Sequence, residues 1–204
     1  MSAMKSNSMI QNKRIPGKNR TMGFLSIDLA ADEKNTTGMA VLEKGTTTFS
    51  VHSDREILEA AEKYRPELVG IDAPLSLPYG RKDISERNGR HFRECDLELR
   101  KLGIRFFPIT IGGMRRLTRR GMKLKEMLEG RGYRVVEIFP GASFDLLGIE
   151  RKHVVKANEF LGCKASNVHE SDAAIGAYTL FLYSKGKAEF LSGKDGEILV
   201  PSPA

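Results

Sequence analysis

The 204-residue sequence has few of the features that define several common protein classes. It has only two cysteines, Cys95 and Cys163, and their spacing fits no zinc-binding pattern. We expect both thiols to be free, as is usual in a reducing compartment. No apolar run approaches the roughly 20 residues that cross a bilayer, and the polar, basic start lacks the apolar segment of a secretory signal. These absences favour a cytoplasmic protein that does not contact the membrane.

Several motifs of nucleotide-binding and nucleophilic enzymes are also missing. There is no phosphate-binding P-loop and no Rossmann glycine fingerprint, and Gly112-Gly113 completes neither. Ser143 lacks the glycine two positions later that a nucleophile elbow requires. The turn after Asp28 lacks the glycine-rich loop of sugar kinases, and Cys95 has no obvious base beside it to make a thiol nucleophile. Any chemistry must therefore come from other side chains.

The charge is unevenly distributed along the chain, whose formal net charge is +7. Residues 1–20 carry five Lys/Arg and no acidic residue, and residues 76–134 carry sixteen basic and seven acidic residues, a local charge of +9. Residues 21–75 and 135–204 are acidic, at −5 and −2. An acidic region beside a basic surface suits a phosphate-rich substrate, because the basic surface attracts it.

Hydrophobic periodicity and turn residues predict the elements of one α/β domain over residues 21–204, preceded by a flexible basic tail at 1–20. The tail either touches nucleic acid or is simply a disordered terminus. Strands are expected at 24–30, 37–43, 46–52, 68–73 and 134–139, with a terminal hairpin at 188–200. Helices are expected at 54–64 (capped by Asp54), 85–102, 114–129, 144–147, 153–161 and 172–183 (capped by Ser171).

The spacing of these elements also predicts how they connect. The links between the first three strands are too short for crossovers, so these strands should form an antiparallel meander. A helix separates the third strand from the fourth, which implies a right-handed crossover and parallel pairing. A basic, helical insertion at about 76–133 separates the fourth strand from the fifth. This order predicts an RNase H-like mixed five-stranded sheet flanked by helices.

Three carboxylates, Asp28, Asp72 and Glu137, end or interrupt the apolar strands, and a fourth, Asp172, opens an apolar helix. An acid within a buried strand costs several kcal/mol unless a partner or a metal compensates it. Several such acids are typical of a site for a divalent cation, because Mg²⁺ and Mn²⁺ prefer oxygen ligands.

Each carboxylate also has a simpler interpretation. Asp28 and Asp72 could cap turns at strand ends, and Asp172 could interact with the positive end of its helix. Glu137 could pair with an arginine of the insertion instead of joining a metal cluster. His169 and Glu170 lie beside Asp172, where His169 could move protons or simply be solvated.

Five segments resemble a family of predicted nucleases with an RNase H-like fold, over residues 22–185. They are Ile27-Asp28-Leu29-Ala30, Gly70-Ile71-Asp72-Ala73-Pro74-Leu75, Arg93-Glu94-Cys95-Asp96, Glu137-Ile138-Phe139-Pro140 and Ser171-Asp172-Ala173-Ala174. The resemblance implies a phosphodiester hydrolase in which Asp28, Asp72 and Asp172 bind Mg²⁺ or Mn²⁺, with Glu137 as a possible fourth member. It places Arg93 at the edge of the site, reaching a phosphate; the alternative is a structural ion pair with Asp96.

The densest basic stretch supplies the candidate substrate contacts, which are Arg115, Arg116, Arg119 and Arg120. Such a run could hold a phosphate backbone, DNA or RNA, without reading its sequence, or it could be an ordinary solvated helix face. Two other functions stay open. One is a nucleic-acid-binding protein without turnover. The other is a hydrolase or phosphotransferase for a small phosphorylated molecule, with a closed pocket formed by Tyr79, Phe92, Phe106 and Phe107.

Overall fold

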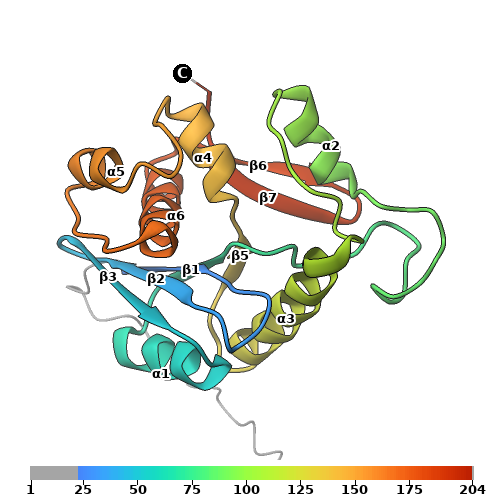
Figure 1. The fold of residues 1–204 in the computed structure, drawn as a ribbon, viewed down its shortest axis with the longest axis horizontal. Coiled ribbons are helices and arrows are strands. Elements are labelled where there is room, and N and C mark those ends of the chain that lie inside the picture. The colour runs from blue at the N-terminus through green and yellow to red at the C-terminus, as the bar shows by residue number, and fades with distance from the viewer. Residues whose placement is uncertain (1–22, 204) are drawn as a thin grey trace, which may run out of the picture.

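A five-stranded mixed sheet forms the centre of the computed structural model, which describes residues 23–203 (Figure 1). The expected tail at residues 1–20 lies outside the described residues. The strand order is β3-β2-β1-β4-β5, with β1 (Phe24–Asp28), β2 (Thr37–Leu42) and β3 (Thr46–Val51) antiparallel. β4 (Leu68–Ile71) and β5 (Val135–Glu137) are parallel to β1. This is the RNase H-like arrangement that the sequence predicts.

Helices cover both faces of the sheet (Figure 1). α1 (Asp54–Tyr64) and α3 (Gly112–Glu129) lie on one face. α4 (Pro140–Leu146), α5 (Val154–Leu161) and α6 (Val168–Ser184) lie on the other. The short α2 (Glu94–Lys101) packs on a separate hairpin of β6 (Ala188–Gly193) and β7 (Gly196–Pro201). A parallel bridge between Ile138 and Leu199 joins this hairpin to the segment after β5.

The two core layers follow from the alternation of side chains along the strands. Leu25 and Ile27 of β1 belong to the cluster that contains α1 and α3, whereas Phe24 belongs to the cluster under α6. α6 lies unusually close to the sheet. A Cβ added at Gly38 would lie 2.0 Å from the His169 carbonyl oxygen, and one at Gly176 would lie 2.2 Å from Ser26 Oγ. Glycine at both positions therefore fixes the height of α6 above β1 and β2.

The helix expected at 85–102 is only half present, because α2 begins at Glu94. The Arg81 side chain explains the difference. Its guanidinium donates to the backbone carbonyls of Ile84, Glu86 and Arg90 and holds this segment as a loop. Those carbonyls are then bonded to a side chain and not to helical N–H groups.

Two expected helix caps are wrong by a few residues. α1 is capped by Ser53, which forms a capping box with Glu56, and not by Asp54. α6 begins at Val168, where the Asn167 side chain accepts the Glu170 N–H at 3.0 Å, and not after Ser171. Asp172 therefore lies in the second turn, beyond the part of the helix where its dipole acts most strongly on an acid.

No helix within residues 23–203 is long and apolar enough to span a membrane. Cys95 and Cys163 are both free and buried. Burial raises the pKa of Cys95 to about 12, which keeps its thiol protonated and unreactive at neutral pH.

Candidate active site

Asp28 and Asp72 lie next to each other at the carboxyl ends of two neighbouring parallel strands. Asp28 ends β1, and Asp72 directly follows β4. The strands pair in register, and the Asp72 backbone N–H donates to the Ile27 carbonyl at 2.8 Å. The two carboxyl groups are close enough that Asp28 raises the pKa of Asp72. The pairing of β1 with β4 therefore brings together two acids that are 44 positions apart.

The first two turns of α6 add a third acid and a histidine to this pair. His169 Nδ1 lies 2.7 Å from an Asp28 carboxylate oxygen. Asp172 follows one turn later on the same helix, and its pKa responds to the charges of both Asp28 and His169. The close packing of α6 at Gly38, the β2 residue paired with Asp28, sets this arrangement.

The charged forms of two of these carboxyl groups, Asp72 and Asp172, are disfavoured by their surroundings. Burial raises the pKa of Asp72 well above its ordinary value, and the charges of Asp28, Asp172 and Glu137 raise it further. Burial and the charge of Asp28 raise the pKa of Asp172 to about 7, although His169, Arg151 and Lys152 oppose the change. These shifts show that the protein leaves negative charge at this site only partly compensated.

Oxygen donors with uncompensated negative charge suit a hard divalent cation such as Mg²⁺ or Mn²⁺. Within residues 23–203, however, no three His, Cys, Asp or Glu side chains are arranged to hold a metal ion. The carboxylate oxygens of Asp28, Asp72 and Asp172 thus have the chemistry that the expected cation prefers. Their side chains are not arranged around a common metal position in this structure.

Glu137 forms an ion pair with Arg93, which was one of the two interpretations left open by the sequence. Its two oxygens accept from Arg93 Nη1 and Nη2 at 2.6 Å each, and one also accepts the Leu75 N–H at 2.8 Å. Both side chains are almost fully buried. Glu137 is close enough to Asp72 for its charge to raise the pKa of that residue, and both side chains line the same cavity.

Arg93 does not have the free donors that a phosphate contact would need. Its five N–H groups are directed at Asp96, Glu137 and the Ser76 hydroxyl. Burial alone would lower the pKa of Arg93, but Glu137 and Asp96 outweigh that effect and raise it, so the guanidinium stays charged. The structure therefore supports the structural ion pair and not the expected contact with substrate.

The four candidate arginines of α3 divide into two groups. Arg120 is buried and structural, since it binds Asp54, the Ala30 carbonyl and the His52 carbonyl at 2.8–2.9 Å. Arg115, Arg116 and Arg119 are exposed. Arg115 donates to the Thr110 carbonyl, and Arg116 binds Asp32 at 3.1 Å. The exposed three can still present charge to a substrate, whereas Arg120 cannot.

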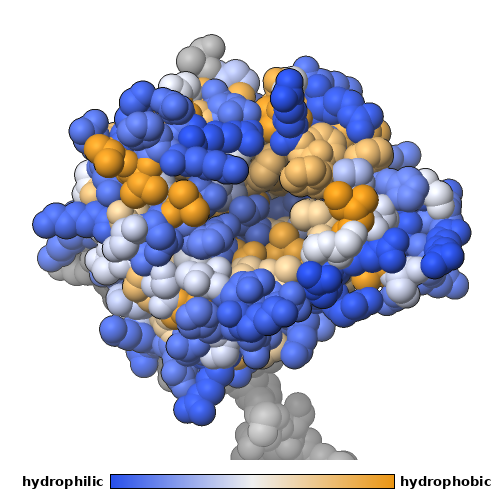
Figure 2. All heavy atoms as spheres, viewed as in Figure 1, coloured by the Kyte–Doolittle hydropathy of each residue, from blue (hydrophilic) through white to orange (hydrophobic). Residues whose placement is uncertain are grey.

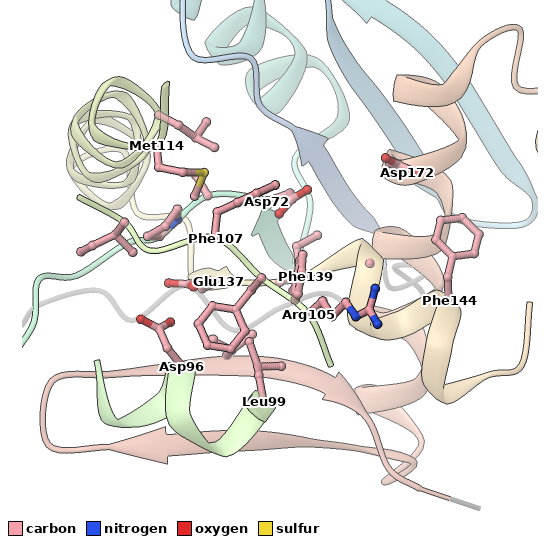
Figure 3. A pocket seen from close by; sticks show the side chains of 18 of the residues that line it. Asp72, Asp96, Leu99, Arg105, Phe107, Met114, Glu137, Phe139, Phe144 and Asp172 are labelled. Atoms are coloured by element: carbon pink, nitrogen blue, oxygen red, sulfur yellow. The ribbon is translucent and has the colours of Figure 1, made fainter. Parts of the chain in front are cut away.

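A cavity of about 430 Å³ opens beside the carboxylates (Figure 3). Asp72 and Asp172 lie on one side of it, with Glu137, Asp96 and Leu99 toward the other. The space-filling view shows a hollow on this face, with hydrophobic residues inside a hydrophilic surround (Figure 2). Of the expected pocket residues, Phe106 and Phe107 line the cavity. Tyr79 is 66% exposed and belongs to none of its walls, and Phe92 lines a neighbouring cavity.

Three cationic residues of the cavity were not identified from the sequence: Arg105, Arg151 and Lys152. They lie in short connecting segments, where no periodic pattern indicates a direction for a side chain. Lys152 has a positive φ of 61°, which is uncommon for a residue other than glycine.

The model of a protein family described as "Protein of unknown function (DUF429)" matches residues 27–169. The chain belongs to this family. The matched part of this DUF429 chain contains Asp28, Asp72, Glu137 and His169, and ends three residues before Asp172. A search of curated proteins found no match.

Among solved structures, the DUF429 chain is similar to T. thermophilus RuvC in complex with Holliday junction substrate. The sequences are 15% identical, and the TM-score is 0.49. The likeness covers 86% of this chain and 99% of RuvC.

Proposed function

We propose that this protein hydrolyses phosphodiester bonds with the help of Mg²⁺ or Mn²⁺, and that Asp28, Asp72 and Asp172 are the metal ligands. One observation carries the proposal. Asp28 and Asp72 end neighbouring parallel strands and α6 brings Asp172 beside them, where burial and neighbouring carboxylates raise the pKa values of Asp72 and Asp172. Perturbed groups of this kind beside a cavity are typical of functional sites. A bound divalent cation would supply the missing charge and would activate a water molecule.

The other residues have distinct roles in this proposal. Glu137 and Arg93 support the wall behind Asp72, and Glu137 also keeps the field around Asp72 negative. His169 is half-exposed and hydrogen-bonded to Asp28, so it can orient that carboxylate and exchange a proton with solvent. Arg105, Arg151 and Lys152 would hold a phosphate at the cavity, and Arg115, Arg116 and Arg119 would attract the nucleic acid. We place this activity in the cytoplasm, where free cysteines are usual.

The test is Mn²⁺ binding by calorimetry, followed by hydrolysis of bis(p-nitrophenyl) phosphate and of DNA and RNA substrates. The wild-type protein should bind Mn²⁺, and Asp28→Asn and Asp72→Asn should each weaken binding at least about tenfold and abolish hydrolysis. Asp83→Asn is the control, because this exposed acid lies in the loop before α2. Hydrolysis should stop in EDTA.

A wild-type protein that hydrolyses none of these substrates with either metal would overturn the proposal. If it still bound nucleic acid in EDTA and after loss of Asp28, the function would be binding without turnover.

A further inference from the structure

Several aromatic side chains line the cavity beside Asp72 and Asp172. Phe106, Phe107, Phe139 and Phe144 all line it, together with the cationic Arg105. Phe107 is 70% exposed, although it belongs to a cavity wall. Its ring is therefore accessible to a ligand that enters the cavity. Aromatic faces beside cations are the combination that holds unpaired bases and their phosphates.

The cavity does not end at these rings. A second cavity of about 700 Å³ is lined by Arg105, Phe106, Phe107 and Arg151, all of which also line the first. Beyond them, the Arg100 guanidinium lies 4.6 Å from the ring centre of Phe92 and 5.8 Å from that of Phe106. Rings and guanidinium groups thus alternate along a path that leads away from the carboxylates.

We propose that the 430 Å³ cavity takes one unpaired nucleotide of a single strand, with the base against Phe107 and the next nucleotides in the second cavity. This inference rests on the proposed function for the bond that is cleaved, and it adds the substrate class. The two cavities share walls, so a ligand longer than one nucleotide can occupy both without leaving the aromatic surface.

The size and charge of the site favour a single strand over a duplex. A volume of 430 Å³ is near the lower end of the range for small-ligand pockets, about 300–1,000 Å³, and is too small for paired bases. The cations on the walls would attract a phosphate backbone, while the rings would offer stacking that does not depend on base identity. A purely apolar ligand would offer no charge to Arg105 and Lys152, whereas Arg151 already pairs with Asp145.

The test measures binding in EDTA, so that it does not depend on hydrolysis. A short oligodeoxythymidylate strand carrying one 2-aminopurine reports stacking by quenching of its fluorescence. We expect Phe107→Ala to weaken binding roughly tenfold and to remove the quenching, with Phe107→Leu between Phe107→Ala and wild type. Tyr79→Ala is the matched control, because Tyr79 is equally exposed but lines neither cavity. It should leave binding unchanged.

Further arms compare the same strand paired to its complement, the strand with an abasic site, and free thymidine monophosphate. Weaker binding of the duplex, of the abasic strand and of the mononucleotide supports the proposal. Equal binding of duplex and single strand, or an equal effect of Phe107→Ala and Tyr79→Ala, overturns it. Mononucleotide binding as tight as that of the strand also overturns it and indicates a small-molecule site. If strand binding behaves as expected but no metal supports hydrolysis, the pocket stands and only the proposed catalysis fails.

Discussion

His169 Nδ1 lies 2.7 Å from the carboxylate of Asp28, although 141 positions separate the two residues. The contact joins the first turn of α6 to the end of β1. Since Asp172 lies one turn further along α6, the docking that makes this contact also brings the third acid to the site. The site therefore assembles only when α6 packs on the sheet.

Replacing His169 by Gln should make stability less dependent on pH. The hydrogen bond to Asp28 raises the pKa of His169 above 6.5, so the pair stabilises the folded state at lower pH and loses this effect as pH rises through the folded pKa. At pH 5.5 the free energy of unfolding of the wild type should exceed that of His169→Gln by less than about 1 kcal/mol, because the His169 side chain is half exposed. At pH 8.5 the two proteins should be equally stable. Urea unfolding in EDTA at both pH values measures this. Equal differences at the two pH values would contradict it.

Asp172→Asn should differ from the wild type at high pH, where His169→Gln does not, and it should raise stability instead of lowering it. The folded-state pKa of Asp172 is raised to about 7, so the folded protein holds this proton more tightly than the unfolded chain and loses stability as pH rises from about 4 through 7. In EDTA the variant and the wild type should have the same free energy of unfolding near pH 4. At pH 8 that of the variant should be higher by on the order of 1–2 kcal/mol. Added Mn²⁺ should then stabilise the wild type more than the variant. A variant less stable than wild type at pH 8 in EDTA would rule out the strain on this carboxylate.

Arg93→Met should destabilise the protein severely. Its removal leaves Glu137 and Asp96 buried without their cation, and breaking a buried pair in this way costs about 3–5 kcal/mol. Arg115→Met, which changes an exposed arginine, should stay within about 0.5 kcal/mol of wild type. Urea unfolding distinguishes the two. If Arg93→Met lowered the free energy of unfolding by less than about 1 kcal/mol, the ion pairs of Arg93 with Glu137 and Asp96 would not be important for stability.

Gly38→Ala and Gly176→Ala separate the packing of α6 from the chemistry of the site. Both substitutions place a methyl group against α6 or its partner strand, and each should cost about 1–3 kcal/mol. Only Gly38 contacts the backbone of His169, so only Gly38→Ala should also weaken Mn²⁺ binding under conditions where both variants are folded. Calorimetry after a folding check by circular dichroism measures this. The same loss of Mn²⁺ binding in both variants would contradict this. It would show that metal binding depends on the distance between α6 and the sheet, and not on the position of the first turn of α6.

Arg119 and Arg120 are neighbours with different expected effects. Arg120→Ala should lower stability by roughly 1–3 kcal/mol, because its partners are the partly buried Asp54 carboxylate and two backbone carbonyls. Arg119→Ala should leave stability within about 0.5 kcal/mol but weaken nucleic-acid binding and reduce its salt dependence. Urea unfolding and binding titrations at several salt concentrations test this pair. Binding that is unaffected in Arg119→Ala would exclude it from the interface.

Local patterns were sufficient to predict the strands and the acids that end them, and the short connections require the meander of the first three strands. That the strands of Asp28 and Asp72 are neighbours followed from the RNase H-like order of the elements, because the meander does not include the fourth strand. The sequence did not show whether Glu137 binds a metal or pairs with an arginine. Arg93 is 44 positions away in a loop-to-helix junction, and only the folded chain shows that its donors are already used.

The errors at the helix starts have a common physical origin. Side chains compete with the backbone for hydrogen bonds, as Arg81 does before α2 and Asn167 does before α6. A sequence pattern predicts which face of a helix is apolar. It does not predict which polar side chain bonds the backbone at the start of the helix and so sets its first residue. The cationic wall of Arg105, Arg151 and Lys152 was missed for a similar reason, since directions in short loops depend on tertiary packing.

The hairpin of β6 and β7 protects the last strand of the main sheet. β5 ends the sheet, and Leu199 of β7 forms a bridge with Ile138 directly after it. The turn residue Asp195 also accepts the N–H groups of Tyr79 and Glu94, which ties the hairpin to the start of α2. Unpaired sheet edges invite strands from other molecules. A chain that lost this hairpin would expose the sheet edge beside Asp72 and Glu137, so solubility and the integrity of the candidate site would be lost together.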